Sequence, residues 1–242
     1  GFFPADHWIA DEDAYRATLE AAASLATAKG AIATLGITPT YPSTGYGYIE
    51  QGDTVGTYDN LPAYQVARFT EKPDQTTAET FITSGRFSWN SGMFIFPTAV
   101  MLQELDTHAP ELMTALRTQG IDAYPGLTKL SIDYAVMEKT DKACVMPVSF
   151  GWDDLGDWNA VERLLKSPDK PNVEMAQHLA LDTTGSIVYT SDADEVIVTI
   201  GLEDIVVVRD GKATLVVHKS RTQDIKKAVK ALGADVQFQD LL

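Results

Sequence analysis

The chain reads ACVMPVSFGWDDLGDW over residues 143–158: a mostly apolar run, a loop with two adjacent carboxylates, and the start of a short helix. The apolar run at 143–150 predicts a buried strand, and residues 151–157 are typical of a loop. Asp157 is a candidate N-cap for a helix over residues 158–165. A strand, a polar loop and a helix in this order are typical of an α/β sheet.

The same alternation is found upstream. Gly30 and Gly85 stand where C-cap glycines end helices, and residues 52–62 are rich in turn formers, which predicts an irregular connection. Ser131 is a candidate N-cap for a further helix. Helices are expected at residues 12–30, 75–84, 97–105, 108–117 and 132–139, and strands at 31–36, 46–51, 64–71 and 91–96.

The texture of the sequence changes after the linker-like stretch Ser-Pro-Asp-Lys-Pro at residues 167–171. Short β-rich runs follow at 179–180, 186–190, 195–199, 205–208 and 213–218, and a helix is expected at 222–232. We therefore expect an α/β domain at residues 1–167 and a small β-rich module at 168–242. No exact repeat is visible, so a β-helix-like form of the module stays open.

Composition excludes several classes of protein. The 242 residues include 34 acidic and 19 basic side chains, which gives a net charge of −15. This acidic balance argues against nucleic-acid binding, and no apolar run approaches the roughly 18–20 residues that span a bilayer. Cys144 is the single cysteine, so an intrachain disulfide is excluded, and a reducing cytoplasm is the expected compartment.

The chain begins Gly1-Phe2-Phe3-Pro4, which resembles the last residues of a buried strand and has none of the features of a signal peptide. We expect that part of the native protein precedes this strand end. The alternative is a trimmed and frayed terminus.

Two acidic positions are candidates for a metal site. Asp6 follows the apolar strand end, and Asp154 lies with Asp153 in the glycine-bracketed loop. Carboxylates at strand ends lie where open α/β sheets bind ligands, and Mg²⁺ takes one or two of them. The alternative is that these carboxylates only cap turns and helices.

Three further segments carry candidate binding residues. Pro73 ends a strand and leaves Glu71 and Lys72 at that end, where a lysine suits a phosphate and a carboxylate suits sugar hydroxyls. Asn90 offers donors and an acceptor for a polyol, and Gly47 permits close approach of the backbone. The alternative for Glu71 and Lys72 is an exposed ion pair of little energetic value.

Taken together and in order, seven segments resemble the sugar-1-phosphate nucleotidyltransferases, and within that family the mannose-1-phosphate guanylyltransferases. The matching residues are 4–9, 38–49, 69–74, 89–94, 131–139, 151–158 and 201–208. The resemblance implies a Rossmann-like nucleotidyltransferase sheet, of which this chain holds part. It also implies a reaction of mannose 1-phosphate with GTP to give GDP-mannose and pyrophosphate.

The resemblance also implies roles for individual residues. Asp6 and Asp154 match the aspartates that hold the catalytic Mg²⁺, and Lys72 matches the lysine that contacts the sugar phosphate. The positions of Gly47, Glu71 and Asn90 match those that read the hexose.

The remaining acidic matches imply lesser roles. Asp153 lies beside the metal ligand and is expected to support it. Ser131 and Asp133 match a segment whose expected role is structural.

The chain departs from the family in one respect. The family's N-terminal glycine-rich stretch, which carries an arginine and a lysine and grips the nucleotide, has no match, and neither has the base-reading segment. Two alternatives therefore stay open: a non-catalytic regulatory or sugar-nucleotide-sensing relative, and an enzyme for another hexose 1-phosphate. A homodimer through the C-terminal module and its last helix is also open.

Overall fold

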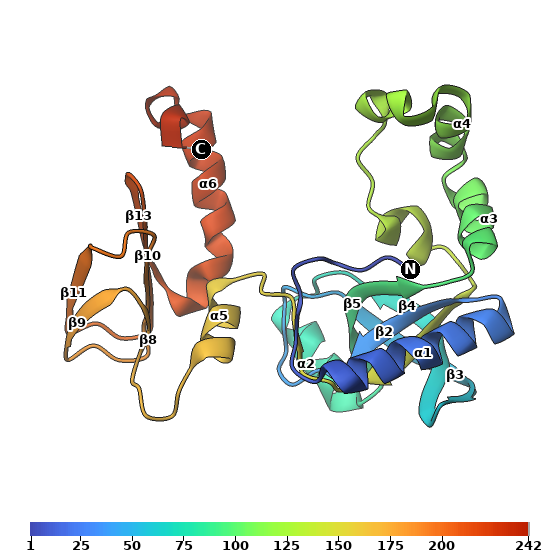
Figure 1. The fold of residues 1–242 in the computed structure, drawn as a ribbon, viewed down its shortest axis with the longest axis horizontal. Helices are drawn as coiled ribbons and strands as arrows, with labels where there is room; N and C mark the ends of the chain where they lie inside the picture. The colour runs from blue at the N-terminus through green and yellow to red at the C-terminus, as the bar shows by residue number, and fades with distance from the viewer. Residues whose placement is uncertain (242) are drawn as a thin grey trace. The chain divides into compact units, whose positions relative to one another are not determined.

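Residues 1–241 are described by a computed structural model, in which the chain divides after Trp152 into two units. The first unit is built around a mixed sheet, and the second around a stack of short strands (Figure 1). In chain order the elements up to residue 153 are β1 (Trp8–Ile9), α1 (Glu12–Lys29), β2 (Ile32–Ile37), β3 (Tyr48–Tyr58), β4 (Leu61–Thr70), α2 (Gln75–Ser84), β5 (Phe87–Ile95), α3 (Thr98–His108), α4 (Pro110–Gln119), the 3₁₀ segment η1 (Gly120–Gly126), the π-helical segment η2 (Asp133–Met137), β6 (Ala143–Val148) and β7 (Trp152–Asp153).

The sheet of the first unit has the strand order β2-β5-β3-β4-β6, and β6 pairs back to β2 so that the five strands close on themselves. Only β2 and β6 are parallel; their register runs from Ile32 opposite Ala143 to Ile37 opposite Val148. All six residues of β2 are buried, as expected of the central strand of a sheet covered on both faces. The predicted α/β fold class is confirmed.

Helix α1 covers this sheet, as Figure 1 shows in blue. Asp11 caps its start by accepting a hydrogen bond from Ala14 N at 2.9 Å, and Gly30 ends it in the left-handed conformation, with φ of 60°. Its buried face, which includes Leu25, packs in one apolar cluster with Leu35 and Tyr48 of the sheet. The helices expected at residues 12–30 and 75–84 are both confirmed.

The irregular connection expected at residues 52–62 is wrong. Strand β3 continues to Tyr58 and β4 begins at Leu61, so the two strands form a long hairpin. The turn consists of Asp59 and Asn60, whose φ angles are 45° and 68°. Both residue types tolerate the left-handed conformation that a two-residue hairpin turn requires. The pairing of β3 with β4 shifts register between Gln51 and Gly56. These irregularities accommodate Gly52 and Gly56, the glycines that suggested a loop, within the strand.

The helix expected at residues 132–139 is also corrected. The segment forms a five-residue π-helical turn, η2, in which Glu138 N donates to Asp133 O at 2.9 Å. Such turns are rare and occur often at functional sites. Val136 and Met137 from η2 pack with Phe94 and Met101 in a second apolar cluster.

The second unit contains a short β-helix. Its elements are α5 (Trp158–Leu165), β8 (Val173–Met175), β9 (Gln177–Leu181), β10 (Ile187–Thr190), β11 (Val196–Ile200), β12 (Ile205–Asp210), β13 (Ala213–His218), the 3₁₀ segment η3 (Lys219–Asp224), α6 (Ile225–Ala234) and the 3₁₀ segment η4 (Val236–Leu241).

Two parallel ladders define the coils of this β-helix. One is β8-β10-β12 and the other is β9-β11, and a step of 19 residues separates both Ile187 from Val206 and Gln177 from Val196. Val173, Ile187 and Val206 stack as a buried apolar column. The five β-rich runs expected after residue 178 are confirmed, and β8 is an additional strand.

One further property concerns the helices. None of those in the described residues is both long enough and apolar enough to cross a membrane.

Candidate functional site

The four residues predicted to bind a sugar phosphate lie together in the first unit. Gly47 precedes β3, Glu71 and Lys72 follow β4, and Asn90 lies in β5. Asn90 N donates to Gly47 O at 2.8 Å. A Cβ atom placed on Gly47 would lie 2.6 Å from Glu71 Oε2 and 3.5 Å from Asn90 Cβ. Glycine at position 47 therefore lets the Glu71 carboxylate lie against the backbone.

Lys72 is held in an unusual conformation at the end of β4. Its φ angle is 44°, in the left-handed region, and Pro73 follows it. Its backbone N–H donates to Tyr46 O at 3.2 Å, and its ammonium group forms an ion pair with Glu71. The hydrogen bond to Glu71 raises the pKa of Lys72, and the negative charge of Asp133 adds to this shift. The site thus presents an ammonium group that is charged at neutral pH.

Asn90 has a defined orientation because its amide is bonded on both sides. Nδ2 donates to Asp133 Oδ1 at 3.0 Å, and Oδ1 accepts from Gly92 N at 3.1 Å. Asp133 therefore belongs to the site, although sequence reasoning gave it only a structural role. The sequence pattern does not reveal this position of Asp133, because the N-cap pattern at Ser131 predicts an ordinary helix. The segment instead forms a π-helical turn, which places Asp133 beside Asn90.

An aromatic cluster supports the loop that leads into β3. The ring of Tyr46 contacts Trp89 edge-on at 4.9 Å between centroids and Trp152 at 5.5 Å. Trp89 is only 3% exposed and Phe94 only 1% exposed, so both belong to the core. This packing supports the position of Gly47, one residue from Tyr46.

Asp6 lies in the N-terminal segment of the first unit. Phe2 exchanges two backbone hydrogen bonds with Phe94 of β5, at 2.8 and 3.0 Å. Pro4 lies near Gly92, whose φ of 69° is in the left-handed region that favours glycine. His7 Nδ1 then accepts a hydrogen bond from Trp152 Nε1 at 3.0 Å. The exposed Asp6 is therefore held between two anchored points.

Asp153 ends the two-residue strand β7, which falls within the loop expected at residues 151–157, and Asp154 follows it at the start of the second unit. Asp153 Oδ2 accepts from Arg163 at 2.8 Å, and Asp154 Oδ1 accepts from Gly156 N at 2.9 Å. Asp157 caps α5 by accepting from Ala160 N at 3.0 Å, as predicted. The loop is thus ordered by its own side chains and by α5.

The donor chemistry fits the predicted Mg²⁺ site. Carboxylate oxygens are the protein ligands that Mg²⁺ prefers, and one or two of them suffice when water and phosphate complete the shell. Within residues 1–241, no group of three or more His, Cys, Asp or Glu side chains gathers as a metal cage. Asp6 and Asp154 belong to different units, so their joint role in binding a metal stays a prediction.

Cys144 lies in β6 and is not a candidate nucleophile. It is 3% exposed, and burial raises the pKa of its thiol. The thiol therefore stays protonated near neutral pH, and Cys144 acts as a buried apolar residue of β6.

Family comparisons divide the chain in two. Residues 1–167 match the nucleotidyl transferase family, and residues 176–232 match the family described as the MannoseP isomerase/GMP-like beta-helix domain. The second match agrees with the parallel ladders of the second unit.

Individual relatives agree with the family matches. Mannose-1-phosphate guanylyltransferase ManC of Salmonella typhimurium is 37% identical over 96% of this chain and 50% of its own length. Alginate biosynthesis protein AlgA of Pseudomonas aeruginosa is 38% identical over the same shares. The chain thus spans about half the length of the curated relatives that it matches. A crystal structure described as mannose-1-phosphate geranyltransferase from Thermus thermophilus is 37% identical, with a TM-score of 0.82 over 95% of this chain and 68% of that chain.

Proposed function

The chain belongs to the nucleotidyl transferase family, and from this membership we propose that it forms the sugar-binding part of a mannose-1-phosphate guanylyltransferase. The reaction transfers GMP from GTP to mannose 1-phosphate and gives GDP-mannose and pyrophosphate. The observation that carries this proposal is the convergence of Gly47, Glu71, Lys72 and Asn90 at one place in the first unit. The names of the relatives supply the substrate class.

The chemistry of this group suits a hexose phosphate. The Lys72 ammonium group offers a point charge for the phosphate, and the Glu71 carboxylate and the Asn90 amide offer partners for hydroxyl groups. Lys72 would orient the phosphate whose oxygen attacks the α-phosphorus of GTP in line. Positioning and charge neutralisation suffice for such a transfer, without a covalent enzyme intermediate.

We further propose that Asp6 and Asp154 hold Mg²⁺ in the native protein. Bound there, the ion would neutralise charge that develops on the α-phosphate. Support comes from the carboxylate donors and from the ordering of both segments by the hydrogen bonds described above.

A homodimer through the second unit is also proposed. The outer face of the β9-β11 ladder carries aliphatic side chains that are more than half exposed, namely Leu179, Val196, Val198 and Ile200. Contiguous exposed apolar surface of this kind marks contact sites between proteins. In sedimentation we expect a dimer that Val198→Lys dissociates; a wild-type monomer would contradict this proposal.

We propose the cytoplasm as the compartment, in which the single thiol of Cys144 would stay reduced.

The test of the proposed function is pyrophosphate release by the protein at its native length. GTP and Mg²⁺ are supplied with mannose 1-phosphate, and parallel reactions contain glucose 1-phosphate or ATP. Release that requires mannose 1-phosphate and GTP supports the proposal. Release only with another hexose 1-phosphate would change the substrate, and binding of mannose 1-phosphate without release would favour the regulatory relative.

A further inference from the structure

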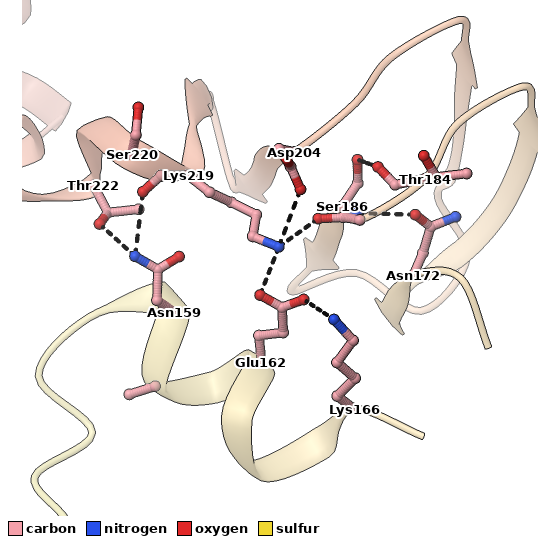
Figure 2. Close-up of polar contacts among 12 residues, drawn as sticks. Asn159, Glu162, Lys166, Asn172, Thr184, Ser186, Asp204, Lys219, Ser220 and Thr222 are labelled. Carbon is pink, nitrogen blue, oxygen red and sulfur yellow. Dashed lines mark hydrogen bonds and ion pairs between the residues drawn. The ribbon is translucent and has the colours of Figure 1, made fainter. Parts of the chain in front are cut away.

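A partly buried ammonium group connects three parts of the second unit (Figure 2). Lys219 Nζ donates to Glu162 Oε2 at 2.6 Å and to Gly185 O at 2.7 Å, and it lies 3.5 Å from Asp204 Oδ1. The side chain of Lys219 is 16% exposed and that of Glu162 is 14% exposed. Three protein oxygens therefore surround an ammonium group that has three donors.

The partners of Lys219 come from two adjacent coils of the β-helix and from α5. Gly185 and Asp204 lie at equivalent corners, and both have φ angles in the left-handed region, 66° and 52°. A Cβ atom on Gly185 would collide with the Asp204 carboxylate, so glycine at this corner lets that carboxylate lie against the backbone. Glu162 is the partner from α5. The backbone of Lys219 is fixed as well, because its N–H donates to Asp204 O at 2.8 Å.

From Lys219 the contacts continue along α5 toward residues 153–157, which carry Asp153 and Asp154 and are hereafter called the acidic loop. Asn159 Nδ2 donates to Lys219 O at 3.2 Å and to Thr222 Oγ1 at 3.0 Å, as Figure 2 shows. The N-cap Asp157 accepts from Gln223 Nε2 at 3.2 Å. Helix α5 is therefore held on η3 and on the β-helix at its first turn and at Glu162.

The acidic loop depends in turn on α5. Arg163 of α5 holds Asp153 by two contacts of 2.8 Å, and Asp157 joins the loop to the helix. Residues 153–167 fall within the nucleotidyl transferase match, whereas Lys219 falls within the β-helix match. A residue of the β-helix thus supports a segment of the transferase domain.

We propose that Lys219 is a positioning residue that fixes the loop of Asp153 and Asp154 through Glu162 and α5. Burial by itself would raise the pKa of Glu162. Hydrogen bonds from Lys219 and Lys166 lower the pKa by more than burial raises it, so the carboxylate is ionised at neutral pH. Ion pairs removed from water contribute little net stability compared with apolar packing, and in some proteins their role is to specify geometry. Removing Lys219 leaves an ionised Glu162 with only the exposed Lys166, and it leaves Gly185 O without its donor.

Amide hydrogen exchange of this chain, without metal, tests the positioning directly. In Lys219→Met we expect exchange in residues 153–162 to become about tenfold faster, as for loss of a charge-assisted hydrogen bond, with β10 and β12 unchanged. Glu162→Gln should give the same local effect, and the double variant should add little to it. Lys227→Met is the matched control, because it removes an exposed ion pair from the same unit.

Two results would overturn the proposal. One is exchange at the wild-type rate in residues 153–162 of Lys219→Met. The other is a uniform increase over the whole β-helix, which would show that Lys219 acts on global stability alone. If Lys219→Met does not fold, Glu162→Gln decides by the same comparison.

The catalytic meaning of this positioning rests on the proposed function and has its own test. In the protein at native length, Lys219→Met should raise the Mn²⁺ concentration needed for half-saturation, measured with Mn²⁺ alone by electron paramagnetic resonance. The KM for mannose 1-phosphate should stay unchanged, because the sugar-phosphate residues lie in the first unit. Unchanged Mn²⁺ affinity would contradict the effect on the loop's metal binding. A wild-type protein that releases no pyrophosphate would instead refute the proposed function, and the exchange result would still decide the positioning.

Discussion

Asn90 and Asp133, 43 residues apart in the chain, are joined by a hydrogen bond of 3.0 Å from the amide Nδ2 to the carboxylate Oδ1. The bond connects β5 to the π-helical turn η2. It determines which side of the Asn90 amide carries the donor, because Oδ1 of the same amide accepts from Gly92 N. The negative charge of Asp133 also raises the pKa of Lys72. Asp133 thereby orients Asn90 and adds negative charge near Lys72, two of the residues predicted to bind the sugar phosphate.

Replacing Asp133 tests this orientation. Asp133→Ala should weaken binding of mannose 1-phosphate about tenfold, because the Asn90 amide loses its acceptor and Lys72 loses a neighbouring charge. Isothermal titration calorimetry measures the change. Ser131→Ala, in the same segment but exposed, is the control and should bind as the wild type does. Equal affinities for Asp133→Ala and the wild type would remove Asp133 from the site.

A methyl group on Gly47 should affect binding more than folding. In Gly47→Ala the new Cβ would lie 2.6 Å from Glu71 Oε2, so the flexible Glu71 side chain must move away. We expect affinity for mannose 1-phosphate to fall about tenfold and the melting temperature to change by no more than about 2 °C. The matched control is Gly126→Ala, where an added Cβ meets no atom within 4 Å. A large loss of stability with normal binding would contradict this account of Gly47.

We expect the stability of the first unit to depend on pH through the buried carboxyl group of Glu104. Burial raises its pKa, but hydrogen bonds from Lys142 and Thr140 outweigh burial, so the pKa lies below the ordinary 4.5. A lowered carboxyl pKa stabilises the fold above the unfolded value, and this contribution is lost as pH falls through the folded pKa. Glu104→Gln should lower the free energy of unfolding by about 1–3 kcal/mol at pH 7.

Chemical denaturation at several pH values measures this effect. The difference between Glu104→Gln and the wild type should shrink as pH falls below 4.5. Glu20→Gln, on the exposed side of α1, should show no difference at any pH. A difference that grows toward acid pH would show that the sign of the pKa shift is wrong.

Asp154 tests the proposed metal site. In the protein at native length, Asp154→Asn should lower kcat at least about a hundredfold, since an amide is a poorer ligand for Mg²⁺ than a carboxylate. Asp169→Asn, an exposed position in the linker, removes the same charge without touching the loop. Near-normal turnover of Asp154→Asn would exclude this residue from the metal site.

Local patterns predicted much of the fold because the interactions behind them are local. The helix at residues 75–84 follows from Asp74 and Gly85, which cap it as the sequence suggests. The hairpin of β3 and β4 was missed because Gly52 and Gly56 resemble turn residues, whereas pairing across the sheet absorbs them as irregularities. That pairing is a long-range effect that a local pattern does not contain.

The candidate site shows the same limit. Gly47, Glu71, Lys72 and Asn90 were predicted from the resemblance of their segments to the family, because the local pattern at each position is weak. Their proximity is visible only in the structure. Asp133 was undervalued because the π-helical turn breaks the helical period expected from Ser131. No sequence pattern marked Lys219, because its partners Glu162, Gly185 and Asp204 are all far from it in the chain.

The most direct test of the sugar-phosphate site is a calorimetric titration of this chain with mannose 1-phosphate. Lys72→Met should weaken binding by about tenfold to a hundredfold, because the phosphate loses its point charge. Lys129→Met removes an exposed lysine of the same unit, and as the control it should bind as the wild type does. Equal affinity of Lys72→Met and the wild type, or no binding by the wild type, would contradict the assignment of this group of residues to a sugar phosphate.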